Sequence, residues 1–232
     1  MFDQKSDNLS NIELLSELGS SDLKDIERSC SFKHYSANEQ VIDRESESTD
    51  IFLIIKGSVR VANYSITGRV ISFADLSEGS YFGELAALDG QPRSASVIGL
   101  TNCFLAILPQ ERFLDLLKDH SSIALKVMRT LAHIIRISTD RIMDLSTVGA
   151  NNRVHADVLR LAKNHLEDGN IAKISPIPIH SDIASRVSTS RETVARVLMD
   201  LARKGVIERQ KKSLLIKDVK KLMNIVEKVK GD

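Results

Sequence analysis

One short segment of the chain carries residue types suited to holding a sugar and a phosphate together. It reads YFGELAALDGQPRSASV, from Tyr81 to Val97, and places Glu84 nine residues before Arg93. A carboxylate accepts a hydrogen bond from a sugar hydroxyl, and a guanidinium clamps a phosphate with two parallel N–H groups. A nucleoside cyclic monophosphate offers both groups close together, so the segment predicts a nucleotide pocket.

A pair of hydroxyl residues interrupts an apolar stripe farther along the chain. The pattern over residues 110–147 predicts one long helix of about 55 Å. Its apolar residues recur at spacings of 3 and 4, with Ser138 among them: Met128, Leu131, Ile135, Ile142 and Leu145. This heptad seam favours a parallel homodimer, and packing on the chain's own β domain is the alternative. A polar seam residue is costly unless it sets register or meets a ligand, so Ser138 and the adjacent Thr139 are candidate contacts.

The second part of the chain is basic, whereas the first part is acidic. Residues 151–232 contain 17 Lys and Arg against 10 Asp and Glu, and residues 1–150 contain 15 against 21. A basic domain favours a polyanionic partner such as DNA, because neutralised phosphates release their counterions. Charge alone leaves open the alternative of a solvated basic surface.

A helix-turn-helix pattern lies within this basic part. Residues 181–205 read SDIASRVSTSRETVARVLMDLARKG, which predicts two helices joined by a tight turn. Ser190 is placed to cap the second helix, and Gly205 to end it. The alternating residues that follow predict a hairpin with Lys211 and Lys212 near its tip. Together these elements predict a winged helix-turn-helix.

The remaining patterns predict an α+β chain of three parts. Short helices are expected over residues 10–30, and short apolar runs separated by glycine turns over residues 32–108 predict an antiparallel jelly roll. The VGANN segment predicts a hinge, with Asn151 or Asn152 capping the next helix. We expect a jelly-roll domain at 1–109, a long dimerisation helix and hinge at 110–148, and a winged helix-turn-helix domain at 149–232.

Several classes of protein are not favoured by the sequence. There is no apolar run of about 18 residues and no signal-peptide core, so we expect a cytoplasmic protein without a membrane partner. Cys30 and Cys103 lie far apart without neighbouring ligands, which argues against a metal site. No nucleophile–base pair stands out, so we do not expect an enzyme.

The chain resembles the CRP/FNR family of bacterial transcription regulators over nearly its whole length. The resemblance rests on IIKGSVRV, FGELAALDGQPRSASV, ISTDRI and SRETVARVL, which occur in that order. It implies that cAMP acts as an allosteric ligand rather than a catalytic cofactor. It also implies homodimers, RNA polymerase as a partner, and palindromic double-stranded DNA with half-sites like TGTGA.

The resemblance assigns roles to individual pocket residues. It implies that Glu84 holds the ribose 2′-hydroxyl, that the Gly83 amide lies near the phosphate, and that Arg93 clamps the phosphate beside the Ser94 hydroxyl. It also implies that the hydroxyls of the long helix reach the base, Thr139 from the partner subunit.

In the second domain the resemblance makes SRETVAR the start of a recognition helix. Arg191, Glu192 and Arg196 are expected to read base edges, since arginine suits guanine and glutamate accepts from cytosine. The remaining candidate DNA contacts are Ser190, Lys211 and Lys212.

Two departures from the family pattern have consequences. The stretch from Glu84 to Arg93 is one residue shorter than in the enteric cAMP receptor proteins, so cGMP remains an alternative ligand. Ser188 stands where helix-turn-helix motifs often have glycine, so a left-handed backbone there would be strained. Two other functions stay open: a DNA-binding regulator with an inert pocket, and a nucleotide-binding regulatory subunit of an enzyme or channel.

Overall fold

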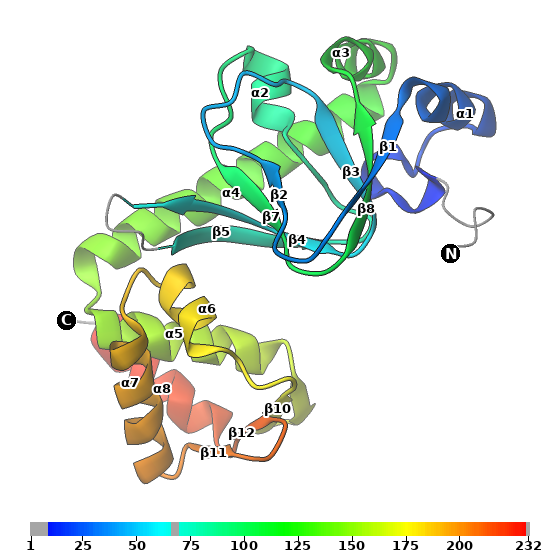
Figure 1. Ribbon diagram of the computed structural model, residues 1–232. Helices are drawn as coiled ribbons and strands as arrows, with labels where there is room; N and C mark the ends of the chain where they lie inside the picture. The colour runs from blue at the N-terminus through cyan, green and yellow to red at the C-terminus, as the bar shows by residue number, and fades with distance from the viewer. Residues whose placement is uncertain (1–8, 66–69, 231–232) are drawn as a thin grey trace. The chain divides into compact units, whose positions relative to one another are not determined.

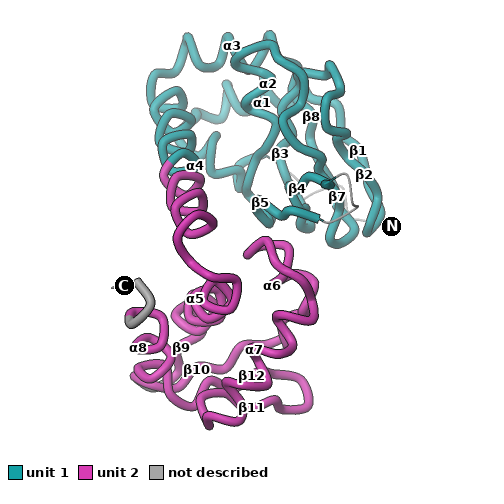
Figure 2. The backbone as a smooth tube through the Cα atoms, turned by 90° about the vertical axis from the view of Figure 1, so that its left-hand side faces the viewer, with its two compact units in different colours: residues 1–135 teal, residues 136–232 magenta. Residues whose placement is uncertain are grey.

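The computed structural model describes residues 9–65 and 70–230. The chain divides into two compact units, Met1–Ile135 and Arg136–Asp232 (Figure 2). This division falls within a helix, whereas the sequence predicted boundaries after residues 109 and 148.

The N-terminal unit is built around two antiparallel sheets (Figure 1). One sheet has the strand order β1-β8-β3-β6 and the other β2-β7-β4-β5. The strands are β1 Ser31–Tyr35, β2 Gln40–Ile42, β3 Ile51–Lys56, β4 Ser58–Tyr64, β5 Val70–Ser77, β6 Tyr81–Phe82, β7 Ser96–Gly99 and β8 Cys103–Leu108. The predicted antiparallel β domain is therefore confirmed.

Strand β3 separates two apolar cores, which explains its unbroken hydrophobic sequence. Ile51, Leu53 and Ile55 pack in a cluster with residues of the helices, including Phe113. Their neighbours point to the opposite face, because successive strand residues alternate, and Phe52 there packs with the interior of the two sheets. The strand is thus buried on both faces, as few antiparallel strands are.

The helices of this unit differ in part from the prediction. Residues 10–30 contain one α-helix, α1 Ser20–Ser29, preceded by the 3-10 turns Leu9–Asn11 and Glu13–Leu15. The segment expected to form one helix from residue 110 contains two, α3 Gln110–Asp119 and α4 Ser121–Thr147. The single 55 Å helix was therefore wrong, and the 27 residues of α4 span about 40 Å.

The break between these helices lies at His120, whose backbone is extended (φ −126°, ψ 91°). Its carbonyl accepts the N–H groups of Ile123 and Ala124, so a new helix starts there. The surrounding DHSS residues are weak helix formers that compete for backbone hydrogen bonds, which favours a break. Ile123 and Val127 are then buried in the N-terminal unit, so this unit extends into α4.

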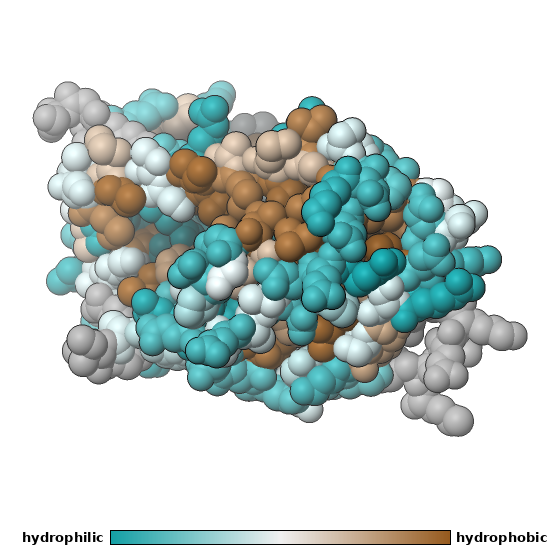
Figure 3. All heavy atoms as spheres, turned by 90° about the horizontal axis from the view of Figure 1, so that it is seen from above, coloured by the Kyte–Doolittle hydropathy of each residue, from teal (hydrophilic) through white to brown (hydrophobic). Residues whose placement is uncertain are grey.

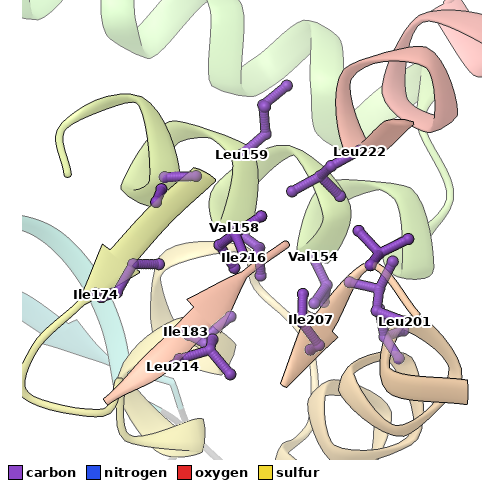
Figure 4. Packing of buried hydrophobic residues seen from close by; sticks show 14 of the residues in the cluster. Val154, Val158, Leu159, Ile174, Ile183, Leu201, Ile207, Leu214, Ile216 and Leu222 are labelled. Atoms are coloured by element: carbon purple, nitrogen blue, oxygen red, sulfur yellow. The ribbon is translucent and has the colours of Figure 1, made fainter. Parts of the chain in front are cut away.

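The C-terminal unit confirms the winged helix-turn-helix. Its elements after α4 are α5 Ala150–Lys163, β9 Leu166–Asp168, β10 Ile171–Ile174, α6 His180–Arg186, α7 Arg191–Arg203, β11 Ile207–Arg209, β12 Leu214–Ile216 and α8 Val219–Lys230. Val154 and Val158 of α5 meet Ile183 and Leu201 of the other helices in one core, together with the β11–β12 wing (Figure 4).

The hinge region differs in one detail from its prediction. Gly149 occupies the position before α5 and provides no side-chain cap, while Asn151 and Asn152 lie within the first helical turn. The expected asparagine cap was therefore wrong. Within residues 9–65 and 70–230, no helix has the length and apolar character needed to cross a membrane.

Candidate functional site

Gly83, Glu84 and Arg93 meet at the short helix α2 (Glu84–Asp89), which follows β6 directly. Arg93 is only 3% exposed. Its Nη1 donates to the Gly83 carbonyl at 3.0 Å, its Nη2 to the Asp50 carbonyl at 2.7 Å, and its Nε to Ser48 Oγ at 3.0 Å. These bonds use three of the five N–H groups of the guanidinium, and the others can meet an anion.

The backbone of Arg93 is fixed as firmly as its side chain. Its N–H donates to the Ser46 carbonyl at 2.9 Å, and its carbonyl accepts the N–H of Glu45 at 2.9 Å. The loop between β2 and β3 therefore holds the arginine in place.

Glycine at position 83 is required by both conformation and space. Its φ is 92°, in the left-handed region. A Cβ there would lie 2.7 Å from Nη1 of Arg93 and 2.9 Å from the Asp50 carbonyl oxygen. Any larger residue would displace the guanidinium or the neighbouring backbone.

Burial disfavours the charged forms of both Glu84 and Arg93. Burial raises the pKa of the Glu84 carboxyl, and nearby Arg93 acts in the opposite direction. Burial also lowers the pKa of the Arg93 guanidinium, while Asp50 and Glu84 oppose that effect. Charged groups whose pKa values are shifted by burial are typical of functional sites, and here one group is an acceptor and the other a donor.

Ser94 is exposed beside the buried arginine. Its carbonyl accepts a hydrogen bond from Nδ2 of Asn63 at 3.1 Å, which ties the end of the loop to β4. Sequence reasoning missed Asn63, Ser48 and Asp50, because each lies in a distant segment and none belongs to a recognisable motif.

The predicted seam residues lie on α4 with differing exposure. Met128, Ile135, Ile142 and Leu145 are 54%, 65%, 64% and 49% exposed. Leu131 is half-buried and packs against the core of the N-terminal unit, so it contributes to the stability of that unit. A row of exposed apolar side chains of this length is unusual on a helix that faces water, and such patches are typical of interaction surfaces.

Other apolar residues also reach the surface of the N-terminal unit. Leu85 and Leu88 of α2 and Leu125 of α4 are exposed. Figure 3, which looks down on this unit, shows apolar residues collected in one area of the surface.

Ser138 and Thr139 are exposed on the part of α4 that belongs to the second compact unit. Their contact with a ligand stays a prediction.

The start of α7 has the predicted cap. Oγ of Ser190 accepts the N–H of Thr193 at 3.2 Å. The helix buries Val194, Val197 and Leu201 and exposes the candidate base readers Arg191, Glu192 and Arg196. Lys211 and Lys212 are exposed in the turn between β11 and β12, as predicted for the wing.

The turn before α7 has the predicted strain. Ser188 adopts φ 51°, a left-handed conformation that costs a residue with a Cβ about 1–2 kcal/mol. The adjacent Thr189 is buried and donates its N–H to the Ala184 carbonyl at 3.0 Å.

A groove of about 350 Å³ lies between α5 and α7, lined by Asn151, His155, Arg196, Val197, Met199, Asp200 and Arg203. Nε2 of His155 is buried and has no hydrogen-bond partner among the residues that the structure describes. Burial is the main cause that lowers the pKa of His155, and Lys204 adds to it. Asp200 is paired with Lys204 Nζ at 2.6 Å, so the guanidinium groups dominate the charge of this groove.

Two family models match the chain on either side of α4. Residues 32–120 match the cyclic nucleotide-binding domain, and residues 152–225 match the Crp-like helix-turn-helix domain. The first match contains the Glu84–Arg93 loop and the second contains α7 with its wing.

Known proteins share this combination. The Cyclic AMP receptor protein of Thermus thermophilus is 33% identical over 157 residues, which cover 68% of this chain and 70% of that protein. The CRP-like cAMP-activated global transcriptional regulator of Mycobacterium tuberculosis is 28% identical over 77% of this chain and 80% of its own length. The structure of a CooA mutant from Carboxydothermus hydrogenoformans has the same fold, with a TM-score of 0.79, 20% identity, and coverage of 95% of this chain and 96% of that one.

The chain therefore combines a cyclic nucleotide-binding domain with a Crp-like helix-turn-helix domain, and α4 lies between the two matched ranges. The chain belongs to the CRP/FNR family, whose members are transcription regulators and not enzymes.

Proposed function

We propose that the protein is a homodimeric regulator that binds a cyclic nucleotide, cAMP in the first instance, and then palindromic DNA. The observation that carries this proposal is the buried guanidinium of Arg93, fixed by Gly83 and close enough to Glu84 to oppose the rise that burial causes in the pKa of its carboxyl. Two similar proteins are named for cAMP, which supports the choice of ligand.

The cyclic phosphate accepts hydrogen bonds from the two remaining N–H groups of Arg93, the Gly83 amide and the Ser94 hydroxyl. The ribose 2′-hydroxyl donates to Glu84, and an ionised carboxylate accepts this bond more strongly than a protonated one. A charge-assisted hydrogen bond contributes about 1.5–3 kcal/mol, so two of them supply useful affinity.

The base of the nucleotide contacts Ser138, and Thr139 of the partner subunit. Both hydroxyls can donate and accept, so guanine is also compatible, and cGMP is the alternative ligand. The apolar stripe of α4 forms the dimer seam through Met128, Ile135, Ile142 and Leu145, and Leu131 contributes from its half-buried position.

Two recognition helices, one from each subunit, enter successive major grooves about 34 Å apart. Arg191, Glu192 and Arg196 read base edges of a TGTGA-type half-site. Ser190, Lys211 and Lys212 contact the phosphates. The regulator works in the cytoplasm with RNA polymerase as its further partner.

The nucleotide controls DNA binding by favouring one arrangement of the dimer. Moving a two-state equilibrium from 1:99 to 99:1 requires about 5.5 kcal/mol of differential binding. One or two charge-assisted bonds in each subunit, at about 1.5–3 kcal/mol each, are of this order.

Calorimetry with cAMP and with cGMP, each with and without a palindromic duplex, tests this function. We expect cAMP to bind and to strengthen DNA binding by at least tenfold. If neither nucleotide changes the affinity for DNA, the protein is instead a DNA-binding regulator whose pocket is inert. The second candidate function is suggested by the three protein acceptors that Arg93 already contacts, because they hold the guanidinium in place without a ligand.

A further inference from the structure

One arginine of α5 bridges two segments on which the placement of α7 depends. Nη1 of Arg153 donates to the Val148 carbonyl at 2.6 Å, just beyond the last residue of α4. Its Nε donates to the Val187 carbonyl at 2.9 Å, and its Nη2 to the Ser188 carbonyl at 3.3 Å. A single guanidinium therefore touches both the end of the long helix and the turn that precedes α7.

The turn at Ser188 needs support from its surroundings. Its left-handed backbone, with φ 51°, is unfavourable for serine and persists only where neighbouring structure determines it. The bonds from Arg153 to the carbonyls of Val187 and Ser188 provide this support on the side of α5.

A second contact binds the same turn to α5. Arg186, the last residue of α6, makes a two-pronged ion pair with Asp157, with Nη2 to Oδ2 at 2.7 Å and Nε to Oδ1 at 3.2 Å. The Asp157 side chain is 5% exposed, so this pair is well shielded from solvent. Three consecutive residues, 186 to 188, are thus held by α5, and the turn must move with that helix.

The chain between α4 and α5 is, in contrast, open to reorientation. Gly149 separates the helices, has no side chain, and would meet nothing within 4 Å if it had a Cβ. The bond from Arg153 to Val148 spans this break.

We infer that Arg153 is a positioning residue that couples the end of α4 to the recognition helix α7. When the chain near Gly149 changes conformation, the Val148 carbonyl moves, and the Arg153 guanidinium that is bonded to it moves as well. Because the same guanidinium is bonded to Val187 and Ser188, the turn before α7 also shifts. The planar fork of arginine holds its acceptors in fixed directions, whereas lysine has a compact charge that cannot do so. The inference rests on the proposed function, since it supplies the route from nucleotide to DNA.

The test compares the full-length wild type with Arg153→Lys and with Arg160→Lys as a matched control. Arg160 lies on the same helix, and its Nη2 donates to Oδ1 of Asp157 at 2.9 Å. The dissociation constant for one palindromic duplex is measured with and without saturating cAMP. The ratio of the two constants is the readout, because a purely structural defect weakens both measurements equally.

We expect the ratio to fall roughly tenfold in Arg153→Lys, within the usual range of coupling between sites, and to stay within twofold of wild type in Arg160→Lys. The affinity of Arg153→Lys for cAMP without DNA should also stay within twofold. Where the lysine variant does not fold, Arg153→Met keeps the packing of the stem and is expected to show the same fall.

Two results would overturn the inference, and they are distinguishable. If cAMP strengthens DNA binding equally in the wild type and in Arg153→Lys, the coupling role of Arg153 is wrong, while the proposed function still stands. A wild type whose DNA affinity ignores both cAMP and cGMP refutes the proposed function, and the coupling with it.

Discussion

Arg93 and Gly83 form a reciprocal pair: Nη1 of the arginine donates to the glycine carbonyl at 3.0 Å, and the same nitrogen lies 2.7 Å from where a Cβ at position 83 would stand. The glycine therefore both anchors the guanidinium and leaves the space that it occupies. Neither residue can be replaced without disturbing the other.

The pair predicts that Gly83→Ala lowers both stability and nucleotide affinity. The left-handed backbone costs a non-glycine residue about 1–3 kcal/mol, and the new methyl group displaces the guanidinium. Gly90→Ala is the matched control: it also has a positive φ, 67°, but its Cβ would meet nothing within 4 Å. Denaturant unfolding should show a loss in both variants, and calorimetry a loss of cAMP affinity in Gly83→Ala alone. An equal loss of affinity in both would contradict the steric argument.

Arg93→Leu should abolish nucleotide binding and also destabilise the fold. Its removal leaves two carbonyls and the Ser48 hydroxyl without their donor, and a buried unsatisfied group costs about 1–3 kcal/mol. Arg60→Leu is the control, because Arg60 makes a two-pronged pair with Asp75 at 2.7 and 2.8 Å on the sheet surface. We expect calorimetry to detect cAMP binding in Arg60→Leu and none in Arg93→Leu. Unchanged affinity in Arg93→Leu would refute the pocket assignment.

Glu84 predicts opposite effects of pH on stability and on binding. Burial raises the pKa of its carboxyl in the folded protein, so the folded state binds this proton more tightly than the unfolded state. The contribution of Glu84 to the free energy of unfolding therefore falls as pH rises from the pKa of the unfolded chain through that of the folded one. Glu84→Gln should accordingly stabilise the nucleotide-free protein at neutral pH, with the gain vanishing in acid.

Nucleotide binding should respond in the other direction, because the ribose hydroxyl bonds more strongly to an ionised carboxylate than to a protonated one. cAMP affinity of the wild type should fall as pH drops through the pKa of Glu84, and Glu84→Gln should bind weakly at every pH. Urea unfolding and calorimetry from pH 4 to 8 measure both effects. The exposed Glu78 supplies the control, Glu78→Gln, which should change neither. A wild-type affinity that is flat across this range would exclude Glu84 as the hydroxyl acceptor.

Local patterns predicted the antiparallel β domain and the winged helix-turn-helix, whereas long-range contacts determine the geometry around Arg93. The cap at Ser190 followed from the residue types at the start of the helix, and the strain at Ser188 from a comparison with the helix-turn-helix motif. The partners of Arg93 could not be predicted, because Ser48 and Asp50 lie 45 and 43 residues away. Only the pairing of strands brings those segments together.

The helices that were missed or divided have local physical reasons. The six residues of α2 are too few to show a helical period, and the helix starts from a left-handed glycine. The break at His120 interrupts an apolar spacing that continues on either side, so the pattern predicted one helix where the backbone forms two. Hydrogen bonding by polar residues, rather than hydrophobic spacing, set that boundary.

Measurements of DNA binding should distinguish basic residues that read bases from those that contact phosphates. Arg191→Ala is expected to cost about 1–3 kcal/mol on the specific duplex and to relax preference at one base pair. Lys212→Ala, in the exposed turn of the wing, should weaken binding equally on all sequences and reduce the slope of log K against log salt by about 1. Fluorescence anisotropy on specific and random duplexes over a range of salt gives both quantities. An equal loss from Arg191→Ala on random DNA would refute base reading by this residue.

Ser138 lies in the apolar stripe of α4, between Ile135 and Ile142. Ser138→Ala removes a hydroxyl and leaves an apolar seam residue, so dimerisation should be unchanged or stronger, while the response of DNA binding to cAMP falls. Ile142→Ala is the matched comparison: it shortens an apolar side chain that is 64% exposed in the single chain, so it should weaken the dimer and leave the affinity of each subunit for cAMP nearly intact. Sedimentation equilibrium measures the dimer, and calorimetry the nucleotide. If Ser138→Ala weakens the dimer more than the nucleotide response, the hydroxyl has a structural role and the base must be held elsewhere.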